Sequence, residues 1–130
     1  MTKIFISYSR LDRELVDDLS HELSQRGLDV WSDRNIKAGE DWWEEIKQAA
    51  EKVDYYILVL TPNSIASQST NFEMGVALSR QDEAYVIPVL MKDVRIPHHL
   101  SSLQYLDGRN VDTSKLGEKI SEIIKNKESE

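Results

Sequence analysis

Short apolar runs alternate with helical patterns along this 130-residue chain, and this alternation constrains the fold more than any other feature. Runs rich in β-forming residues occupy 3–7, 28–31, 55–60 and 85–90, with a shorter candidate at 104–106. Strands separated by helices favour right-handed crossovers and a parallel sheet covered on both faces. Five strands in a chain of this length predict an α/β fold, a flavodoxin-like five-stranded parallel sheet of order 2-1-3-4-5 with helices on both faces.

The segments between these runs carry helical patterns. The first has one apolar face, formed by Leu15, Val16, Leu19 and Leu23, and ends at Gly27. Ser9 and Asp12 have the spacing of a capping pair at its start. Further helices are expected between Gly39 and Val53, over 70–80 and over about 114–125. Pro88, inside the fourth strand, indicates a free edge or a bulge at that point.

Length and composition indicate one soluble domain, which we expect to span 1–125. The polar tail 126–130 is expected to fray or to serve as a linker. The chain has no cysteine, which excludes disulfides and thiolate metal sites, and its net charge of −7 disfavours direct nucleic-acid binding. No apolar run approaches the roughly 20 residues that span a bilayer. We therefore expect no membrane association and a cytoplasmic location.

A ligand in such a fold is expected at the carboxyl ends of the strands, where the strand order reverses. Here that point lies between the first strand, followed by Tyr8, Ser9 and Arg10, and the third strand, followed by Thr61 to Ser64. Glu73 belongs to the helix after the third strand, so topology brings its carboxylate towards the same edge.

Other ligand sites of this fold do not fit the sequence. A phospho-receiver domain needs an aspartate at the end of the third strand, where this chain has Thr61. No glycine-rich phosphate loop follows the first strand. His98 and His99 are adjacent and do not easily share one ion, so we expect no metal.

Glu73 itself allows two interpretations, because it is a single charge in the otherwise apolar or small run 72–78. Thr70 and Glu73 match a capping box, and a helical wheel places Glu73 near Arg80 on a possible solvated stripe. Alternatively, the carboxylate takes part in chemistry. The spacing alone favours the capping interpretation, since capping boxes are common.

The segments IFISYSRLD, LDVWSDRNIKAGEDWWEEI, DYYILVLTPNSIASQSTNFEMGVAL and YVIPVLM, in this order, resemble a bacterial Toll/interleukin-1 receptor (TIR) domain of the NAD-cleaving type. The resemblance covers nearly the whole chain. Many bacterial and plant members cleave the nicotinamide bond of NAD+ with a glutamate in the helix after the third strand, which matches Glu73. The resemblance implies NAD+ as substrate, no further cofactor, and a role in antiviral defence with activation by self-assembly.

The resemblance also implies roles for the loops. Ser7 and Ser9 are candidate hydroxyl contacts to the substrate, and Arg10 and Arg34 are candidate partners of its diphosphate. The family's association loop corresponds to 31–39, in which Asp33, Arg34, Ile36 and Gly39 are candidates for contacts with other TIR domains.

One position departs from the family pattern. The family often has a tryptophan four residues before its glutamate, and this chain has Ser69 there, which is a candidate substrate contact by its position. A stacking surface for the ligand would then come from Tyr8, Trp31, Trp42 or Phe72, for which core packing is the competing role.

Three functions remain open from the sequence. The first is an NAD+ nucleosidase that releases nicotinamide and either linear or cyclic ADP-ribose. The second is an adapter that acts only by TIR–TIR association and does not need Glu73. The third is an enzyme resembling nucleoside deoxyribosyltransferases, against which the loop 33–39 argues.

Overall fold

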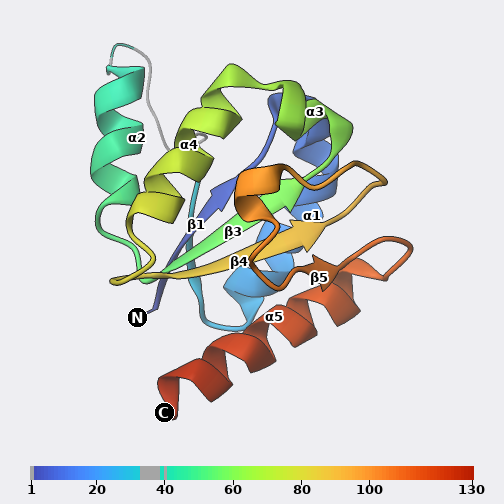
Figure 1. Ribbon diagram of the computed structural model, residues 1–130. Helices are drawn as coiled ribbons and strands as arrows, with labels where there is room; N and C mark the ends of the chain where they lie inside the picture. The colour runs from blue at the N-terminus through green and yellow to red at the C-terminus, as the bar shows by residue number, and fades with distance from the viewer. Residues whose placement is uncertain (1, 33–38, 40) are drawn as a thin grey trace.

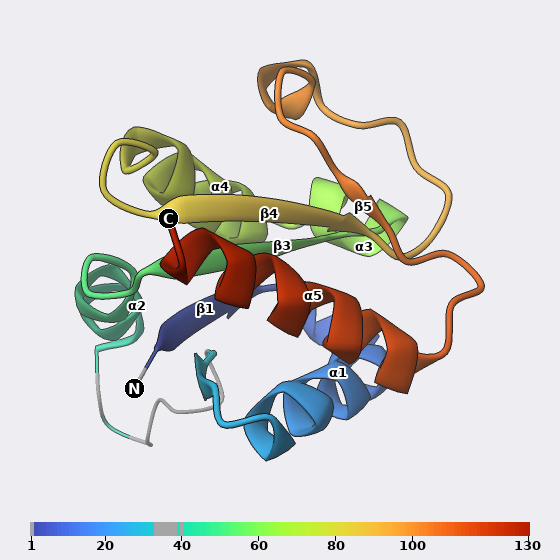
Figure 2. The same ribbon diagram turned by 90° about the horizontal axis from the view of Figure 1, so that it is seen from below.

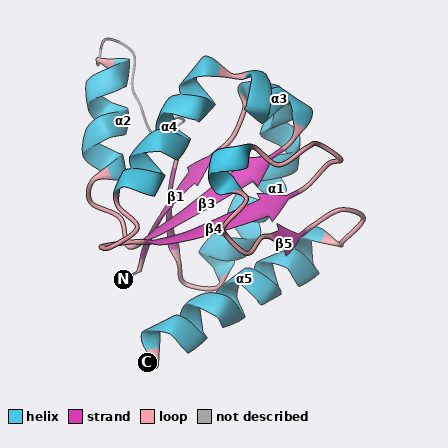
Figure 3. Ribbon diagram, in the orientation of Figure 1, coloured by secondary structure: helices cyan, strands magenta, loops and turns pink. Residues whose placement is uncertain are grey.

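The computed structural model describes residues 2–32, 39 and 41–130, without the side chains of Trp42 and Trp43. Five parallel strands form one sheet in the order β2-β1-β3-β4-β5, which confirms the predicted flavodoxin-like topology (Figures 1 and 3). The strands are β1 (Lys3–Ser7), β2 (Asp29–Trp31), β3 (Tyr55–Leu60), β4 (Tyr85–Leu90) and β5 (Leu106–Asp107). The central strand β3 is buried along its whole length.

Alternating side chains along each strand supply two separate cores. The helices α1 (Arg13–Gln25) and α5 (Thr113–Glu128) lie side by side on one face of the sheet (Figure 2). Ile4 and Ile6 of β1 point into the core beneath them. The helices α2 (Trp42–Ala50) and α4 (Gln68–Ser79) cover the opposite face, where Phe5 packs (Figure 1). The parity of a strand residue therefore decides which pair of helices it meets.

The structure differs from the predicted helices after β3 in two ways. A short helix, α3 (Pro62–Ala66), follows β3 directly, and its capping box is formed by Thr61 and Ser64. The next helix, α4, begins at Gln68 with Ser67 as its N-cap, two residues earlier than predicted. A helix over 62–66 was not predicted, because Thr61-Pro62-Asn63-Ser64 has the composition of a turn, whereas proline is equally suited to the first turn of a helix.

Of the tail 126–130, for which fraying or a linker role is predicted, the residues up to Glu128 form the end of α5. The hydroxyl of Thr2 donates a hydrogen bond of 2.5 Å to Glu128 Oε1. Lys127 Nζ lies 5.1 Å from the centre of the Tyr85 ring. These contacts hold the last turn of α5 against the start of the chain and the start of β4.

Pro88 agrees with the prediction of a free edge. It lies opposite Leu58 of β3, whereas the pairing between β4 and β5 covers only Val89 and Leu90. The missing N–H of proline therefore removes no hydrogen bond from that pairing. The one-turn helices η1 (Arg10–Asp12) and η3 (His98–Leu100) lie in the loops after β1 and β4. None of the helices within 2–32 and 41–130 has the length and apolar character needed to cross a membrane.

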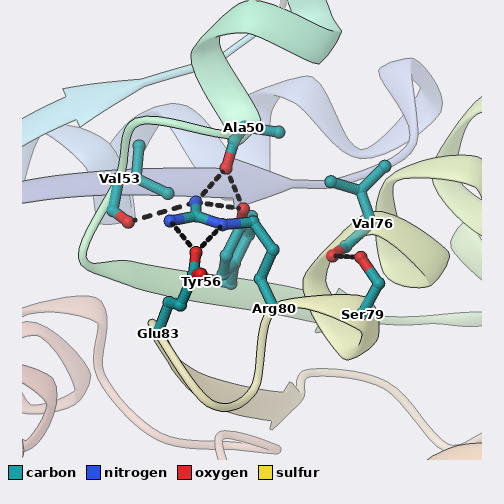
Figure 4. A network of polar contacts seen from close by, with 7 residues as sticks. All are labelled: Ala50, Val53, Tyr56, Val76, Ser79, Arg80 and Glu83. Atoms are coloured by element: carbon teal, nitrogen blue, oxygen red, sulfur yellow. Dashed lines mark hydrogen bonds and ion pairs between the residues drawn. The ribbon is translucent and has the colours of Figure 1, made fainter.

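Arg80, at the C-terminal end of α4, fixes this helix to α2 (Figure 4). Its Nη1 donates to the carbonyl oxygen of Ala50 at 2.6 Å and to the hydroxyl of Tyr56 at 3.0 Å. The Tyr56 hydroxyl in turn donates to the same carbonyl oxygen. Burial raises the pKa of Tyr56, so the phenol remains a donor at neutral pH. Arg80 therefore satisfies a carbonyl oxygen at the end of α2 that its own helix leaves free.

Replacing either of two helical glycines, Gly75 or Gly117, by alanine is expected to change the free energy of unfolding, with opposite signs at the two positions. Gly75 in α4 is exposed, and a Cβ atom added there would meet nothing within 4 Å. Gly117 in α5 is buried against α1, and an added Cβ atom would lie 2.9 Å from Glu22 Cβ. We expect Gly75→Ala to raise the free energy of unfolding by about 0.5–1 kcal/mol, because alanine has less conformational freedom to lose.

Gly117→Ala should lower the free energy of unfolding by about 1–3 kcal/mol, because α1 and α5 must separate to accept the methyl group. Urea denaturation of both variants, followed by far-UV circular dichroism, measures the two changes. A stabilised Gly117→Ala would contradict the close approach of the two helices.

Candidate active site

Ser7 and Glu73 form a buried hydrogen bond at the carboxyl edge of the sheet. Ser7 ends β1, and strand parity turns its side chain away from the face of Ile4 and Ile6, towards α4. Its Oγ donates to Glu73 Oε1 at 2.8 Å. Ser7 is fully buried, and Glu73 is 5% exposed. An ionised carboxylate in such a place requires hydrogen-bond donors, because burial removes its hydration.

Glu73 belongs to the buried stripe of α4, which consists of Thr70, Glu73, Met74 and Ala77. Both structural interpretations of Glu73 from its sequence context are wrong. Ser67 is the N-cap, so Thr70 lies in the first turn and Glu73 in the second, too far along the helix for a capping box. Arg80 hydrogen-bonds Glu83, Tyr56 and backbone carbonyl oxygens, and Glu73 does not lie on a solvated stripe.

A second buried carboxylate, Asp12, lies at the same edge of the sheet. Asp12 Oδ2 accepts a hydrogen bond of 2.5 Å from Thr61 Oγ1, and Oδ1 accepts one of 3.0 Å from Asn63 Nδ2. Lys92 Nζ lies 3.9 Å from Oδ1. Strand parity places Thr61 on the face of Tyr55, Ile57 and Val59, which is the face covered by α1. The two carboxylates therefore lie on opposite faces of the sheet.

The predicted capping pair of Ser9 and Asp12 is half correct. Ser9 Oγ accepts the N–H of Leu11 at 3.3 Å and so caps η1. The Asp12 side chain makes no capping hydrogen bond to α1, for which Asp12 is the N-cap residue. Sequence reasoning missed the contact with Thr61 because it joins positions 49 residues apart.

The TIR domain family model matches residues 4–124, which is nearly the whole chain. The chain belongs to the TIR domain family. This TIR domain is 32% identical over 90 residues to a probable 2′ cyclic ADP-D-ribose synthase of Methanobrevibacter olleyae, and 25% identical over 92 residues to a 2′ cyclic ADP-D-ribose synthase of Bacteroides thetaiotaomicron. The matches cover 67% and 68% of this chain, but only 26% and 32% of those two proteins.

Solved structures agree on the fold. The TIR domain of a Toll-related receptor from Hydra magnipapillata superposes with a TM-score of 0.79 at 22% identity, over 95% of each chain. The heterodimer of the RPS4 and RRS1 TIR domains gives 0.68 at 20% identity, covering 97% of each chain. A 2-deoxyribosyltransferase from Bacillus psychrosaccharolyticus gives 0.65 at 15% identity, covering 89% and 90%. At these identities the likeness concerns the fold alone.

The other predicted substrate contacts of this TIR domain lie in different surroundings. Tyr8 is buried in the core on the face of α1 and α5, opposite to Glu73, so its observed role is packing. Ser9 is buried and caps η1. Arg10 is exposed, as a residue that meets a diphosphate must be, but its role stays a prediction. Ser69 is half-buried, and its Oγ lies 3.1 Å from Ser67 Oγ.

The association-loop candidates Asp33, Arg34 and Ile36 lie outside the described residues, as does the side chain of Trp42. Gly39 is exposed and has a φ of +89°, a conformation that favours glycine. Trp31 stacks on Phe5 with a ring separation of 5.1 Å, which is a packing role. Phe72 is 37% exposed and lies next to Glu73 in the sequence, so it stays a candidate for a ligand contact.

At the carboxyl end of β5, Arg109 forms ion pairs with Asp93 and Asp107. Hydrogen bonds from the Arg109 guanidinium lower the pKa of Asp107 to about 2, and Arg109 also pairs with Asp93 at 2.6 Å. Within the described part of the chain, no cluster of three or more histidine or acidic residues has the geometry of a metal site.

Thr70 carries a fully buried hydroxyl that has no hydrogen-bond partner among the described residues. A buried polar group without a partner costs about 1–3 kcal/mol. We therefore expect Thr70→Val, which replaces the hydroxyl by a methyl group of similar size, to leave the free energy of unfolding unchanged or to raise it by up to about 1–3 kcal/mol.

Thr61→Val is the matched control, because the Thr61 hydroxyl donates to Asp12. Its loss should destabilise the protein by about 1.5–3 kcal/mol, since the acceptor is a carboxylate. Urea denaturation compares the two variants. Equal destabilisation by both substitutions would show that the Thr70 hydroxyl has a partner in solution.

Proposed function

We propose that this TIR domain cleaves the bond between nicotinamide and ribose in NAD+, with Glu73 as the catalytic carboxylate. The observation that carries the proposal is the buried hydrogen bond between Ser7 and Glu73 at the carboxyl edge of the sheet. Ligands of parallel α/β folds bind at this edge, where the strand order reverses. Membership of the TIR family and the names of the two synthase relatives support the choice of substrate.

The chemistry needs only one carboxylate. When the bond to nicotinamide breaks, its electron pair goes to the pyridinium nitrogen, and the ring leaves as a neutral molecule that requires no proton. Positive charge develops on the ribose, as in glycoside hydrolysis. A fixed anion beside that ribose stabilises the charge, and the stabilisation is larger where water is excluded. The burial of Glu73 meets this requirement.

Ser7 holds one oxygen of the carboxylate, which fixes the direction of the other. The carboxylate then has three possible actions: electrostatic stabilisation, a transient covalent bond to the ribose, or hydrogen bonds to the ribose hydroxyls. Attack by water gives ADP-ribose and a proton. Attack by a hydroxyl of the same molecule gives a cyclic product, which the names of the two relatives favour.

In this proposal the domain belongs to an effector of antiviral defence that is activated when TIR domains assemble. The heterodimer of the RPS4 and RRS1 TIR domains supports association as a property of the fold. The matched region is less than a third of the length of each synthase relative, so a sensor region outside the present sequence is part of the proposal.

The second candidate function is an adapter that only associates with other TIR domains. The observation in its favour is exposed apolar surface: Leu11 in η1 is 81% exposed, and Phe72 in α4 is 37% exposed. An adapter does not require the carboxylate of Glu73, so activity measurements separate the two functions.

Glu73→Gln tests the catalytic role. The glutamine oxygen still accepts the hydrogen bond from Ser7, so we expect the thermal midpoint of unfolding to stay near that of the wild type. The loss of the negative charge should lower the rate of nicotinamide release by about 100-fold or more. The assay mixes NAD+ with purified protein, at high concentration and with a crowding agent to favour assembly, and measures nicotinamide by liquid chromatography.

Glu118→Gln is the matched control, because Glu118 is an exposed residue of α5 and its replacement removes the same charge. It should retain full activity. Wild-type activity in Glu73→Gln would refute the catalytic assignment. A wild-type protein that releases no nicotinamide under any of these conditions would favour the adapter.

A further inference from the structure

Two sets of hydrogen bonds connect the same two stretches of chain. The first stretch runs from the end of β1 through η1, residues 7–12, and the second runs from the end of β3 through α3 into α4, residues 61–73. Ser7 in the first stretch bonds Glu73 in the second. Five residues after Ser7, Asp12 bonds Thr61 and Asn63, which lie at the start of the second stretch.

The two connections lie on opposite faces of the sheet. Ser7 faces α4, whereas Thr61 faces α1 and η1. The carboxyl edge of β1 and β3 is thus held from both sides. A shift of one stretch relative to the other would lengthen both sets of hydrogen bonds together.

Asp12 is a buried side chain that links separate segments by hydrogen bonds. Its carboxylate is 1% exposed, and each oxygen has its own donor, Thr61 Oγ1 at 2.5 Å and Asn63 Nδ2 at 3.0 Å. Lys92, whose side chain is 57% exposed, contributes a longer contact of 3.9 Å from the loop after β4. A hydrogen bond to a charged acceptor is stronger than one between neutral groups. One side chain therefore joins the segments that follow β1, β3 and β4.

We propose that Asp12 is a positioning residue, which sets the placement of Ser7 relative to Glu73 by holding η1 to Thr61 and Asn63. Its buried carboxylate does not meet substrate. The predicted effect of Asp12 on catalysis rests on the proposed function of Glu73. The predicted effect of Asp12 on the geometry of the Ser7–Glu73 contact is independent of that function.

The expected effect is on turnover. A misplacement of about 1 Å in a catalytic group lowers the rate about 100-fold even when the substituted residue is remote. We expect Thr61→Val and Asp12→Asn to lower kcat for nicotinamide release by about 10–100-fold, with KM changed by less than about 3-fold. Thr61→Ser retains the hydroxyl and should restore kcat to near the wild-type value.

Two control variants distinguish a positioning effect of Asp12 from a loss of folding and from a general effect of removing a negative charge. Thr61 also caps α3, and Ser64→Ala removes the other half of that capping box while leaving Asp12 with both donors. Asp18→Asn removes one exposed carboxylate from α1. Both controls should keep the wild-type kcat. All rates are divided by the folded fraction, measured by circular dichroism at the assay temperature.

A second measurement does not depend on activity. The side-chain carboxyl carbon of Glu73 is observed by NMR in protein labelled with ¹³C-glutamate, and Glu73→Gln assigns its signal. We expect Asn63→Ala, which removes one neutral donor from Asp12, to displace this signal, and Ser64→Ala to leave it in place. Asn63→Ala removes a single hydrogen bond and so provides a variant that folds if Asp12→Asn does not.

The outcomes separate this proposal from the proposed function. A displaced Glu73 signal with no nicotinamide release by the wild type would refute NAD+ cleavage and support the positioning role of Asp12. An unmoved Glu73 signal in Asn63→Ala would overturn the positioning role. So would a kcat in Thr61→Val that equals that of Ser64→Ala after correction for the folded fraction.

Discussion

The arrangement of this TIR domain depends on how a buried carboxylate is held at the end of a parallel sheet. Glu73 lies in the interior stripe of α4, where a charge is costly unless it is hydrogen-bonded. Ser7, the last residue of β1, supplies one donor because strand parity turns it towards α4. The helix, the strand and their register must all be correct for this contact to form.

Several contacts far from Glu73 support that register. Asp12 joins η1 to the residues after β3 at the carboxyl edge, on the opposite face from Glu73. Arg80 fixes the other end of α4 to the last turn of α2. Arg80 thus holds the C-terminal end of α4, the helix that carries Glu73. The N-terminal end of α4 follows α3, whose first residues are hydrogen-bonded to Asp12. Buried polar groups of this kind fix a unique arrangement when every partner is satisfied.

The comparisons with other TIR domains show the family and the fold of this chain, whereas its reaction is a proposal. The family match spans residues 4–124, and the superposition with the Hydra domain covers 95% of the chain. Phe72 is an exposed aromatic residue of the helix that carries Glu73 and Ser69. The roles that the resemblance assigns to Ser69 and Glu73 stay predictions.

The sheet, its strand order and the approach of Glu73 to its carboxyl edge could be predicted from the sequence, because strand runs, helical periodicity and crossover handedness are local or topological rules. The hydrogen-bond partners of Glu73 and Asp12 depend instead on how the elements pack. Thr70 and Glu73 have the spacing of a capping box, yet Ser67 caps α4, and the Glu73 carboxylate accepts a hydrogen bond from Ser7. Asp12 resembled a capping residue, yet it bonds Thr61 and Asn63. Contacts between residues tens of positions apart depend on how the elements pack, which no local pattern encodes.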